Sequence, residues 1–314
     1  MFLRRSVQAA RRFSMSPTYR SSYVAAPRKT LTDLRSQYEA KAPISVVTAW
    51  DFLTGQIVEK SQADIALVGD SLAMVALGYP DTNEIELDEM LYHIRAVNRG
   101  NASSFIVADM PFGTYEVSTK QAVETAIKIV KHGKAQAVKL EGGQEMADTI
   151  KAIVTAGVPV MGHIGLTPQK HHTLGGYKLQ GNSVEGAQKL IDDALALQEA
   201  GAFSMILECI PSKLAEVVTQ TVKIPTVGIG AGPHVSGQVL VLADMLQMND
   251  PEKYKLAKFV KLYMSFFDNA TEAVSQYKKD VSEGVFPNAD EHGYKIKKDI
   301  LKAARAYAET KKEE

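Results

Sequence analysis

The feature that most constrains this chain is a short unit that recurs along it. An apolar, largely β-branched run stops at a charged or imidazole side chain and then breaks into a loop. Five successive runs end in this way, at Asp70, Asp109, Glu141, His163 and Glu208. In a barrel of parallel strands, functional side chains lie at the carboxyl ends of the strands. The sequence therefore predicts a parallel barrel with ionisable groups gathered at one end.

Strand and helix patterns alternate along most of the chain. Eight strands are predicted, at 44–50, 64–70, 104–109, 137–141, 158–163, 203–208, 226–230 and 239–245. Six helices are predicted between them, at 54–61, 87–99, 119–132, 144–156, 183–200 and 212–221, after a short polar helix at 32–40. The link before the eighth strand is too short for a full helix. This alternation favours a (β/α)8 TIM barrel over an open, doubly wound sheet.

The remainder of the chain reads as a helical extension. Residues 252–277 and 290–310 are polar with helical periodicity, and a loop containing Gly284 and Pro287 separates them. We expect these helices, from about residue 250, to pack on the barrel or to reach a neighbouring subunit. Residues 31–314 are thus predicted to form one catalytic barrel with C-terminal helices.

Charge and composition exclude several classes of partner. Lysine and arginine balance aspartate and glutamate at 36 each, so no electrostatic argument favours nucleic acid or an anionic membrane. No apolar run approaches the ~18 residues that span a bilayer. The single cysteine, Cys209, excludes an intrachain disulfide and a multi-cysteine metal cluster. We therefore expect no nucleic acid and no membrane among the partners.

The first 30 residues differ from the rest of the chain. The first 32 hold seven basic residues and no acidic one, and serine is frequent among them. Leu3, Val7 and Ala10 share one helical face, with arginines on its flank. This pattern is typical of a mitochondrial transit peptide, so we predict a transit peptide at 1–30 and a location in the mitochondrial matrix. The alternative is a basic tail without a targeting function.

Asp70 and Asp109 are the candidate metal ligands. They end the second and third predicted strands, and hard carboxylate oxygens of this kind suit Mg²⁺. The alternative is that each side chain caps the turn that follows it. Glu141 on the next strand favours the metal. His163 is either a further contributor, a substrate hydrogen-bond donor or a core residue.

Lys139 and Glu141 flank Leu140, so both point to the same face of their strand. An inward lysine needs an anionic partner, either a substrate carboxylate or Glu141. Glu208 ends the sixth strand, across the barrel from the two aspartates. Burial raises the pKa of a carboxylate and suits it to act as a general base. The alternative for Glu208 is an ion pair with a basic residue such as Lys139.

Seven blocks of sequence, in order, resemble the ketopantoate hydroxymethyltransferase (3-methyl-2-oxobutanoate hydroxymethyltransferase) family. They lie at 67–72, 109–112, 138–143, 162–169, 175–181, 207–211 and 228–232. The resemblance implies a (β/α)8 barrel of the phosphoenolpyruvate/pyruvate class, often decameric. It implies transfer of a one-carbon unit from 5,10-methylenetetrahydrofolate to 3-methyl-2-oxobutanoate through a Mg²⁺-stabilised enolate. The products are 2-dehydropantoate and tetrahydrofolate, in pantothenate biosynthesis.

The same resemblance implies roles for single residues. Asp70 and Asp109 would bind Mg²⁺, Ser71 and Lys139 would contact the oxo acid, Glu141 would lie near metal-bound water, and Glu208 would be the base. The chain departs from the family pattern at Trp50, where tyrosine is usual, and at 79–85, where the barrel mouth is expected to differ.

Two competing functions remain open. One is another Mg²⁺-dependent oxo-acid lyase or transferase on the same barrel, of the isocitrate lyase kind, which would also use a Mg²⁺-stabilised enolate. It lacks support because no matching nucleophile loop is found in the sequence. A catalytically inactive barrel that serves as an oligomeric scaffold is the other. The presence of Asp70, Asp109 and Glu208 argues against it.

Overall fold

A computed structural model describes residues 28–312, and it contains a closed barrel of eight parallel strands. Each strand pairs with the next one along the chain, and β8 pairs with β1 to close the ring. The strands are β1 (Ile44–Thr48), β2 (Ile65–Val68), β3 (Phe105–Asp109), β4 (Ala137–Glu141), β5 (Val160–Gly165), β6 (Ser204–Glu208), β7 (Thr226–Ile229) and β8 (Gly237–Leu240). The predicted (β/α)8 architecture is confirmed.

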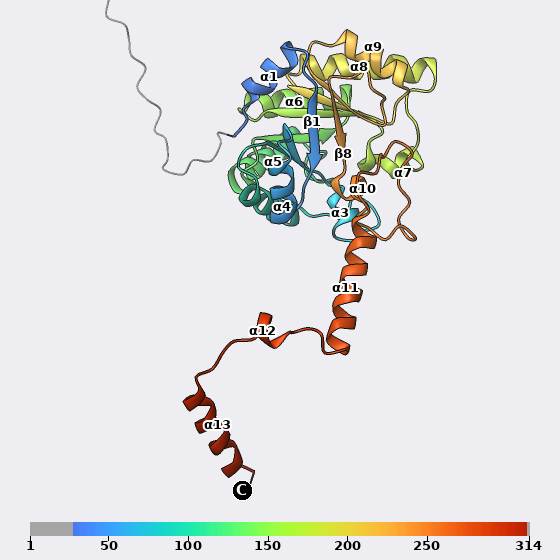
Figure 1. Ribbon diagram of the computed structural model, residues 1–314. Coiled ribbons are helices and arrows are strands. Elements are labelled where there is room, and N and C mark those ends of the chain that lie inside the picture. Colours follow the sequence, from blue (N-terminus) through green and yellow to red (C-terminus); the bar gives the residue numbers. More distant parts are fainter. Residues whose placement is uncertain (1–27, 313–314) are drawn as a thin grey trace, which may run out of the picture.

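Helices surround the barrel in the order that the sequence predicts (Figure 1). The covering helices are α2 (Phe52–Lys60), α4 (Leu87–Gly100), α5 (Thr119–Lys128), α6 (Ala147–Thr155), α8 (Val184–Glu199) and α9 (Ser212–Thr221). A π-helical turn, η1 (Ile129–Gly133), extends α5, and a 3-10 turn, η2 (Gln144–Met146), precedes α6. Short elements η3 (Pro168–Lys170), α3 (Leu72–Val75), α7 (His171–Leu174) and α10 (Leu242–Met245) lie beyond the carboxyl ends of strands.

The barrel interior changes from apolar to ionisable along the strands. Side chains alternate between the two faces of a strand, so inward positions recur every second residue. On β3 the inward series runs Phe105, Val107, Asp109, and on β4 it runs Ala137, Lys139, Glu141; their apolar members belong to one core cluster inside the barrel. A second, larger cluster fills the space between strands and helices. The alternation therefore delivers the charged groups to one end of the interior.

The opposite, amino-terminal end of the barrel is covered by α1 (Leu31–Glu39) (Figure 1). Thr30 and Asp33 form a reciprocal capping box that starts this helix. Leu34 is buried in the interior cluster, with Leu31 and Tyr38 packed against it. Apolar side chains of α1 therefore pack on the core at this end, where a cavity of about 510 Å³ also lies, and the predicted site residues lie at the other end.

The eighth strand lies earlier in the chain than predicted. β8 ends at Leu240, and residues Leu242–Met245 form α10 rather than strand. Gly237 starts β8 where a β-carbon would lie 2.3 Å from the carbonyl oxygen of Ile44, so only glycine fits there. At the other end, the Leu242 N–H donates to the Thr48 hydroxyl at 2.9 Å, which stops the strand.

The prediction of a helix at 252–277 was wrong in its first half. Residues 255–265 contain no helix, and α11 begins only at Phe266 and ends at Ser282. Phe259 packs against the interior core cluster, so the irregular segment lies over the carboxyl end of the barrel. A more extended chain reaches further across that end than a helix of equal length.

The predicted helix at 290–310 is also divided. A short α12 (Ala289–His292) is followed by residues 293–297 without regular structure and then by α13 (Lys298–Thr310). Helices α11 to α13 contain no buried residue and run away from the barrel (Figure 1). Among residues 28–312, no helix is both long and apolar enough to cross a membrane. The predicted transit peptide at 1–30 lies outside the described residues, apart from 28–30.

Candidate active site

A cavity of about 470 Å³ opens at the carboxyl end of the barrel. All seven residues predicted for the site line it: Asp70, Ser71, Asp109, Lys139, Glu141, His163 and Glu208. Their roles remain predictions, but the structure brings them together from five consecutive strands or strand ends. Residues far apart in sequence thus share one cavity.

Asp70 and Asp109 are held against each other. The Asp70 backbone N–H donates to Asp109 Oδ2 at 2.9 Å, and both side chains are buried. Asp70 Oδ2 accepts from the Gln169 amide at 2.7 Å. These partners come from other strands and loops rather than from the turn after each aspartate. The turn-capping alternative therefore does not describe either side chain.

Lys139 pairs with Asp109 rather than with Glu141. Its Nζ lies 3.0 Å from Asp109 Oδ1. The same Nζ lies 3.2 Å from Nδ1 of His163. Burial alone lowers the pKa of Lys139, but the charges of Asp109 and Asp70 outweigh burial, so the net shift is upward and the ammonium stays charged.

His163 connects Lys139 with Glu208. A lysine ammonium only donates, so Nδ1 of His163 accepts and its proton is on Nε2. Nε2 lies 3.1 Å from Glu208 Oε2, although the angle is too poor for a hydrogen bond. Burial, followed by the charge of Lys139, lowers the pKa of His163 well below its ordinary value. A neutral imidazole therefore faces the Glu208 carboxyl group.

The acids of the cavity outnumber its bases. Asp70, Asp109, Glu141 and Glu208 face one buried lysine, Lys139, whereas Lys253 and Lys255 at the mouth are exposed. Burial raises the pKa of Glu208 to about 8, and Asp70 adds to the shift while Lys139 opposes it. Burial also raises the pKa of Asp109 to about 7. The pKa of Glu141 is raised well above its ordinary value by burial and then by Asp70.

This cluster of carboxyl groups fits a divalent cation. Glu141 Oε1 is a buried carboxylate oxygen without a hydrogen-bond donor, and the partner of Asp109 Oδ1 is the Lys139 ammonium. A buried oxygen left without a donor is costly unless a cation or water satisfies it. The donors are all carboxylate oxygens, which Mg²⁺ prefers. The residues present therefore suit a hard ion held by Asp70 and Asp109, with Glu141 close by.

Two residues that sequence reasoning gave no role, Gln169 and Tyr115, organise the carboxylates. Besides holding Asp70, Gln169 donates its backbone N–H to Glu141 Oε2 at 3.1 Å. Tyr115 donates to Gln169 Oε1 at 2.5 Å and accepts from the Glu141 N–H at 3.3 Å. Both are almost fully buried. Gln169 lies in a recognised sequence block, but nothing in its spacing indicates these contacts.

The wall formed after β8 was also missed. Asp244, Lys253, Tyr254, Lys255 and Phe259 line the cavity. Burial raises the pKa of Asp244 to about 6 and, together with Asp244, the pKa of Tyr254 to about 12. The wall was missed because a helix was predicted at 252–277, whereas an irregular segment covers the mouth of the cavity.

The two departures from the family pattern have different outcomes. Trp50 packs against the core between strands and helices and is not among the cavity-lining residues. Its backbone carbonyl accepts from Nδ1 of His93. Segment 79–85 does reach the cavity, through Thr82. The difference at the mouth therefore lies in the second segment.

Comparison with known proteins gives the chain its family. The sequence profile of ketopantoate hydroxymethyltransferase matches residues 28–289. The chain belongs to the ketopantoate hydroxymethyltransferase family. It is 50% identical to a 3-methyl-2-oxobutanoate hydroxymethyltransferase of Emericella nidulans over 279 residues, which are 88% of this chain and 79% of that protein.

Another family member is named as mitochondrial. The 3-methyl-2-oxobutanoate hydroxymethyltransferase 1, mitochondrial, of Arabidopsis thaliana is 48% identical over 272 residues, 86% of this chain and 78% of that protein. The bacterial relative from Carboxydothermus hydrogenoformans is 47% identical over 274 residues, 87% of this chain and 98% of that protein.

Solved structures confirm the fold assigned to this ketopantoate hydroxymethyltransferase family member. Phosphonopyruvate hydrolase in complex with oxalate and Mg²⁺ superposes with a TM-score of 0.55 at 14% identity, over 89% of this chain and 96% of the other. A 2,3-dimethylmalate lyase of the PEP mutase/isocitrate lyase superfamily gives 0.51 at 16% identity, over 90% and 96%. At such identities the likeness shows the barrel fold alone.

Proposed function

We propose that this chain is a 3-methyl-2-oxobutanoate hydroxymethyltransferase that transfers a one-carbon unit from 5,10-methylenetetrahydrofolate to 3-methyl-2-oxobutanoate. The products are 2-dehydropantoate and tetrahydrofolate, as a step of pantothenate biosynthesis. The observation that carries the proposal is the cavity at the carboxyl end of the barrel, where Asp70, Asp109, Glu141 and Glu208 meet one buried lysine, Lys139, and the neutral His163. Relatives of this name, at close to half identity over most of the chain, supply the reaction.

Asp70 and Asp109 would hold Mg²⁺, with Glu141 near its waters. When bound, the ion would supply Lewis-acid stabilisation of negative charge on the oxo acid, worth several kcal/mol. Ser71 caps no turn with its hydroxyl, which therefore remains free for the oxo acid. Lys139 would contact the same substrate and balance its carboxylate.

Glu208 would act as the base. Its raised pKa, about 8, makes its carboxylate a strong enough acceptor to take the proton from C3 of the oxo acid. The neutral His163 lies beside it, with Nε2 3.1 Å from Glu208 Oε2. C3 then forms its bond to the methylene carbon, both bonds from that carbon to the folate nitrogens break, and water supplies the hydroxyl group of 2-dehydropantoate. The C3 proton and one proton of the water go to the two folate nitrogens, and tetrahydrofolate leaves.

A homo-oligomer, with the decamer common in the family as the expected form, is part of the proposal. Its support is the apolar surface of the extension. No residue of α11 or α13 is buried, and the apolar side chains of Val274, Ile300 and Tyr307 are more than half exposed. The mitochondrial matrix is the proposed location, supported by the basic first 30 residues and by the name of the Arabidopsis relative.

The direct test is product formation. Purified protein is given 3-methyl-2-oxobutanoate, methylenetetrahydrofolate and Mg²⁺, and 2-dehydropantoate is measured by mass spectrometry. We expect turnover that requires both the folate and the metal. Turnover of an oxo acid without folate would instead indicate a lyase of the same barrel class, and Mg²⁺ binding without any turnover would indicate an inactive scaffold.

A further inference from the structure

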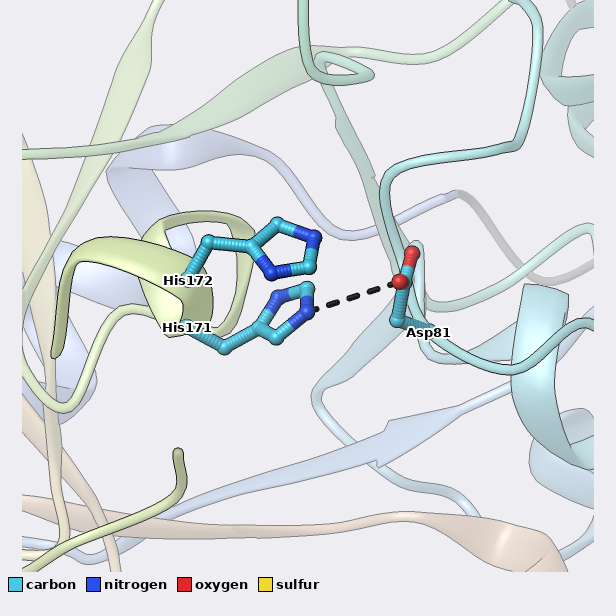
Figure 2. A group of neighbouring side chains, drawn as sticks. All are labelled: Asp81, His171 and His172. Carbon is cyan, nitrogen blue, oxygen red and sulfur yellow. Dashed lines mark ion pairs between the residues drawn. The ribbon is translucent and has the colours of Figure 1, made fainter. Parts of the chain in front are cut away.

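Beside the mouth of the barrel, three metal-ligating side chains meet from two loops. Asp81 lies between β2 and α4, whereas His171 and His172 are the first residues of α7, after β5. Figure 2 shows both imidazoles together on one side, with the Asp81 carboxylate facing them. One ligand atom from each lies within 4.8 Å of the other two. None of the three lines the catalytic cavity.

The remaining polar atoms of Asp81 and His171 are already occupied. Nδ1 of His171 lies 3.0 Å from the Pro168 carbonyl oxygen, which only accepts, so Nδ1 carries a proton. Asp81 Oδ1 accepts from the Asn83 N–H at 2.8 Å. These contacts fix Nε2 of His171 and Oδ2 of Asp81 as the atoms that face each other. A backbone carbonyl on the second nitrogen is the usual support of a metal-binding histidine.

The two facing atoms suit a shared cation. They lie 3.4 Å apart and form no hydrogen bond. In the neutral imidazole, Nε2 holds a lone pair, so both atoms are acceptors and nothing joins them directly. In a tetrahedral Zn²⁺ site with bonds of about 2.0–2.1 Å, neighbouring ligand atoms are about 3.3–3.4 Å apart. The observed separation matches that edge.

His172 provides a third ligand and leaves the site open to solvent. Its ring centroid lies 3.9 Å from that of His171, and its side chain is exposed. The side chains of His171 and Asp81 are 14% and 17% exposed. Two imidazoles and one carboxylate, with a water in the fourth position, form a donor set typical of Zn²⁺ rather than Mg²⁺.

We propose that Asp81, His171 and His172 bind one transition-metal ion of the Zn²⁺ class, at a site separate from the Asp70–Asp109 pair. The ion would join the loop after β2 to the loop after β5. Each of these loops also contributes to the cavity, through Thr82 and Tyr177 respectively. The Tyr177 ring stacks on His171 with an interplanar angle of 13°. The site thus holds the mouth of the barrel together and does not depend on the proposed reaction.

The test measures Zn²⁺ bound by the full-length, untagged chain. Protein is dialysed against Zn²⁺ in excess Mg²⁺, which occupies the hard oxygen site, and its zinc is quantified by elemental analysis. Wild type is compared with the double variant His171→Gln/His172→Gln and with Asp81→Asn, which keeps an acceptor for the Asn83 N–H. The control is His132→Gln/His234→Gln, which removes two exposed histidines elsewhere.

Wild type and the control should bind about one Zn²⁺ more per chain than the double variant, and Asp81→Asn should weaken zinc binding at least 10-fold. Substituting Co²⁺ should give a four-coordinate visible absorption band that the double variant lacks. Equal zinc in wild type and double variant, with circular dichroism showing both folded, would overturn the site. So would an equal loss in the control. In that case Asp81 and His171 form only an ion pair.

A second readout tests the link between the loops. Hydrogen exchange at residues 76–86 and 166–183 should slow on adding Zn²⁺ to wild type and stay unchanged in the double variant. Zinc bound without slower exchange in either loop would contradict the joining role.

Discussion

At the scale of single residues, Gln169 connects the two halves of the carboxylate cluster. Its amide holds Asp70 and its backbone N–H holds Glu141. We predict that Gln169→Ala weakens Mg²⁺ binding about 10–100-fold, because Asp70, the proposed metal ligand, loses the group that orients it. Calorimetric titration with Mg²⁺ measures this, with Gln180→Ala on the exposed loop as control. Unchanged Mg²⁺ affinity in Gln169→Ala would show that Asp70 is held by other contacts.

The raised pKa values of the cavity predict how stability depends on pH without metal. Between pH 6.5 and 8.5 the unfolded chain has lost its carboxyl protons, whereas folded Glu208, with a pKa of about 8, still holds one. Asp109, with a pKa of about 7, acts in the same direction. The folded state therefore binds more protons, and its stability falls as pH rises. The lowered pKa of His163 opposes this only below about pH 6.5.

For Glu208 alone the loss across this range is about 2 kcal/mol. We expect thermal unfolding in a chelator to show a melting temperature that falls between pH 6.5 and 8.5, and a smaller fall in Glu208→Gln. A melting temperature that rises with pH in metal-free wild type would mean that Glu208 is ionised in the folded state.

At the scale of elements, the contact between β5 and β6 sets the position of Glu208. Gly165 has φ +93°, and a β-carbon there would lie 2.2 Å from the Glu208 carbonyl oxygen. That carbonyl accepts from the Leu166 N–H at 2.8 Å. The last residue of β5 must therefore be glycine for β6 to carry its carboxylate into the cavity.

A matched pair of glycines separates this clash from backbone strain. Gly157 has φ +90° with nothing within 4 Å of a β-carbon. We predict that Gly157→Ala lowers the free energy of unfolding by about 1–2 kcal/mol through strain. Gly165→Ala should cost at least about 2 kcal/mol more, because backbone must move. Denaturant unfolding measures both. Equal losses would show that the strands adjust without cost.

The strands and their inward faces were predictable because alternation of side chains is a local property. The five residues Phe105–Asp109 are four apolar residues followed by one carboxylate, which is enough to predict a buried strand with a functional group at its end. Partner choice was not predictable. Lys139 pairs with Asp109 on the neighbouring strand rather than with Glu141 on its own strand, because the barrel register places Asp109 beside it.

The loops account for most of what was missed. Gln169 and Tyr115 reach the cluster only because η3 and the chain after β3 fold back over the barrel end. The displaced β8 and the irregular segment around Phe259 depend on contacts with distant strands, which local periodicity does not contain.

At the scale of the whole molecule, the chain divides into a basic first segment and a remainder in which acidic residues outnumber basic ones. We predict that residues 1–32 fused to a fluorescent reporter direct it to mitochondria, because the segment holds seven basic residues and no acid. The control replaces Arg4, Arg5, Arg11 and Arg12 with glutamine and should leave the reporter in the cytosol. A wild-type fusion that stays entirely cytosolic would refute the prediction of mitochondrial targeting.

The central claim is that Glu208 removes the C3 proton of the oxo acid before the carbon–carbon bond forms. Glu208→Gln keeps the size of the side chain but cannot accept that proton. The decisive measurement is exchange of the C3 proton of 3-methyl-2-oxobutanoate with D₂O, followed by NMR, in the presence of Mg²⁺ and tetrahydrofolate. Wild type should exchange it, and Glu208→Gln should do so at least about 100-fold more slowly with substrate affinity little changed. Exchange at the wild-type rate in Glu208→Gln would contradict the account and leave Glu208 a structural residue.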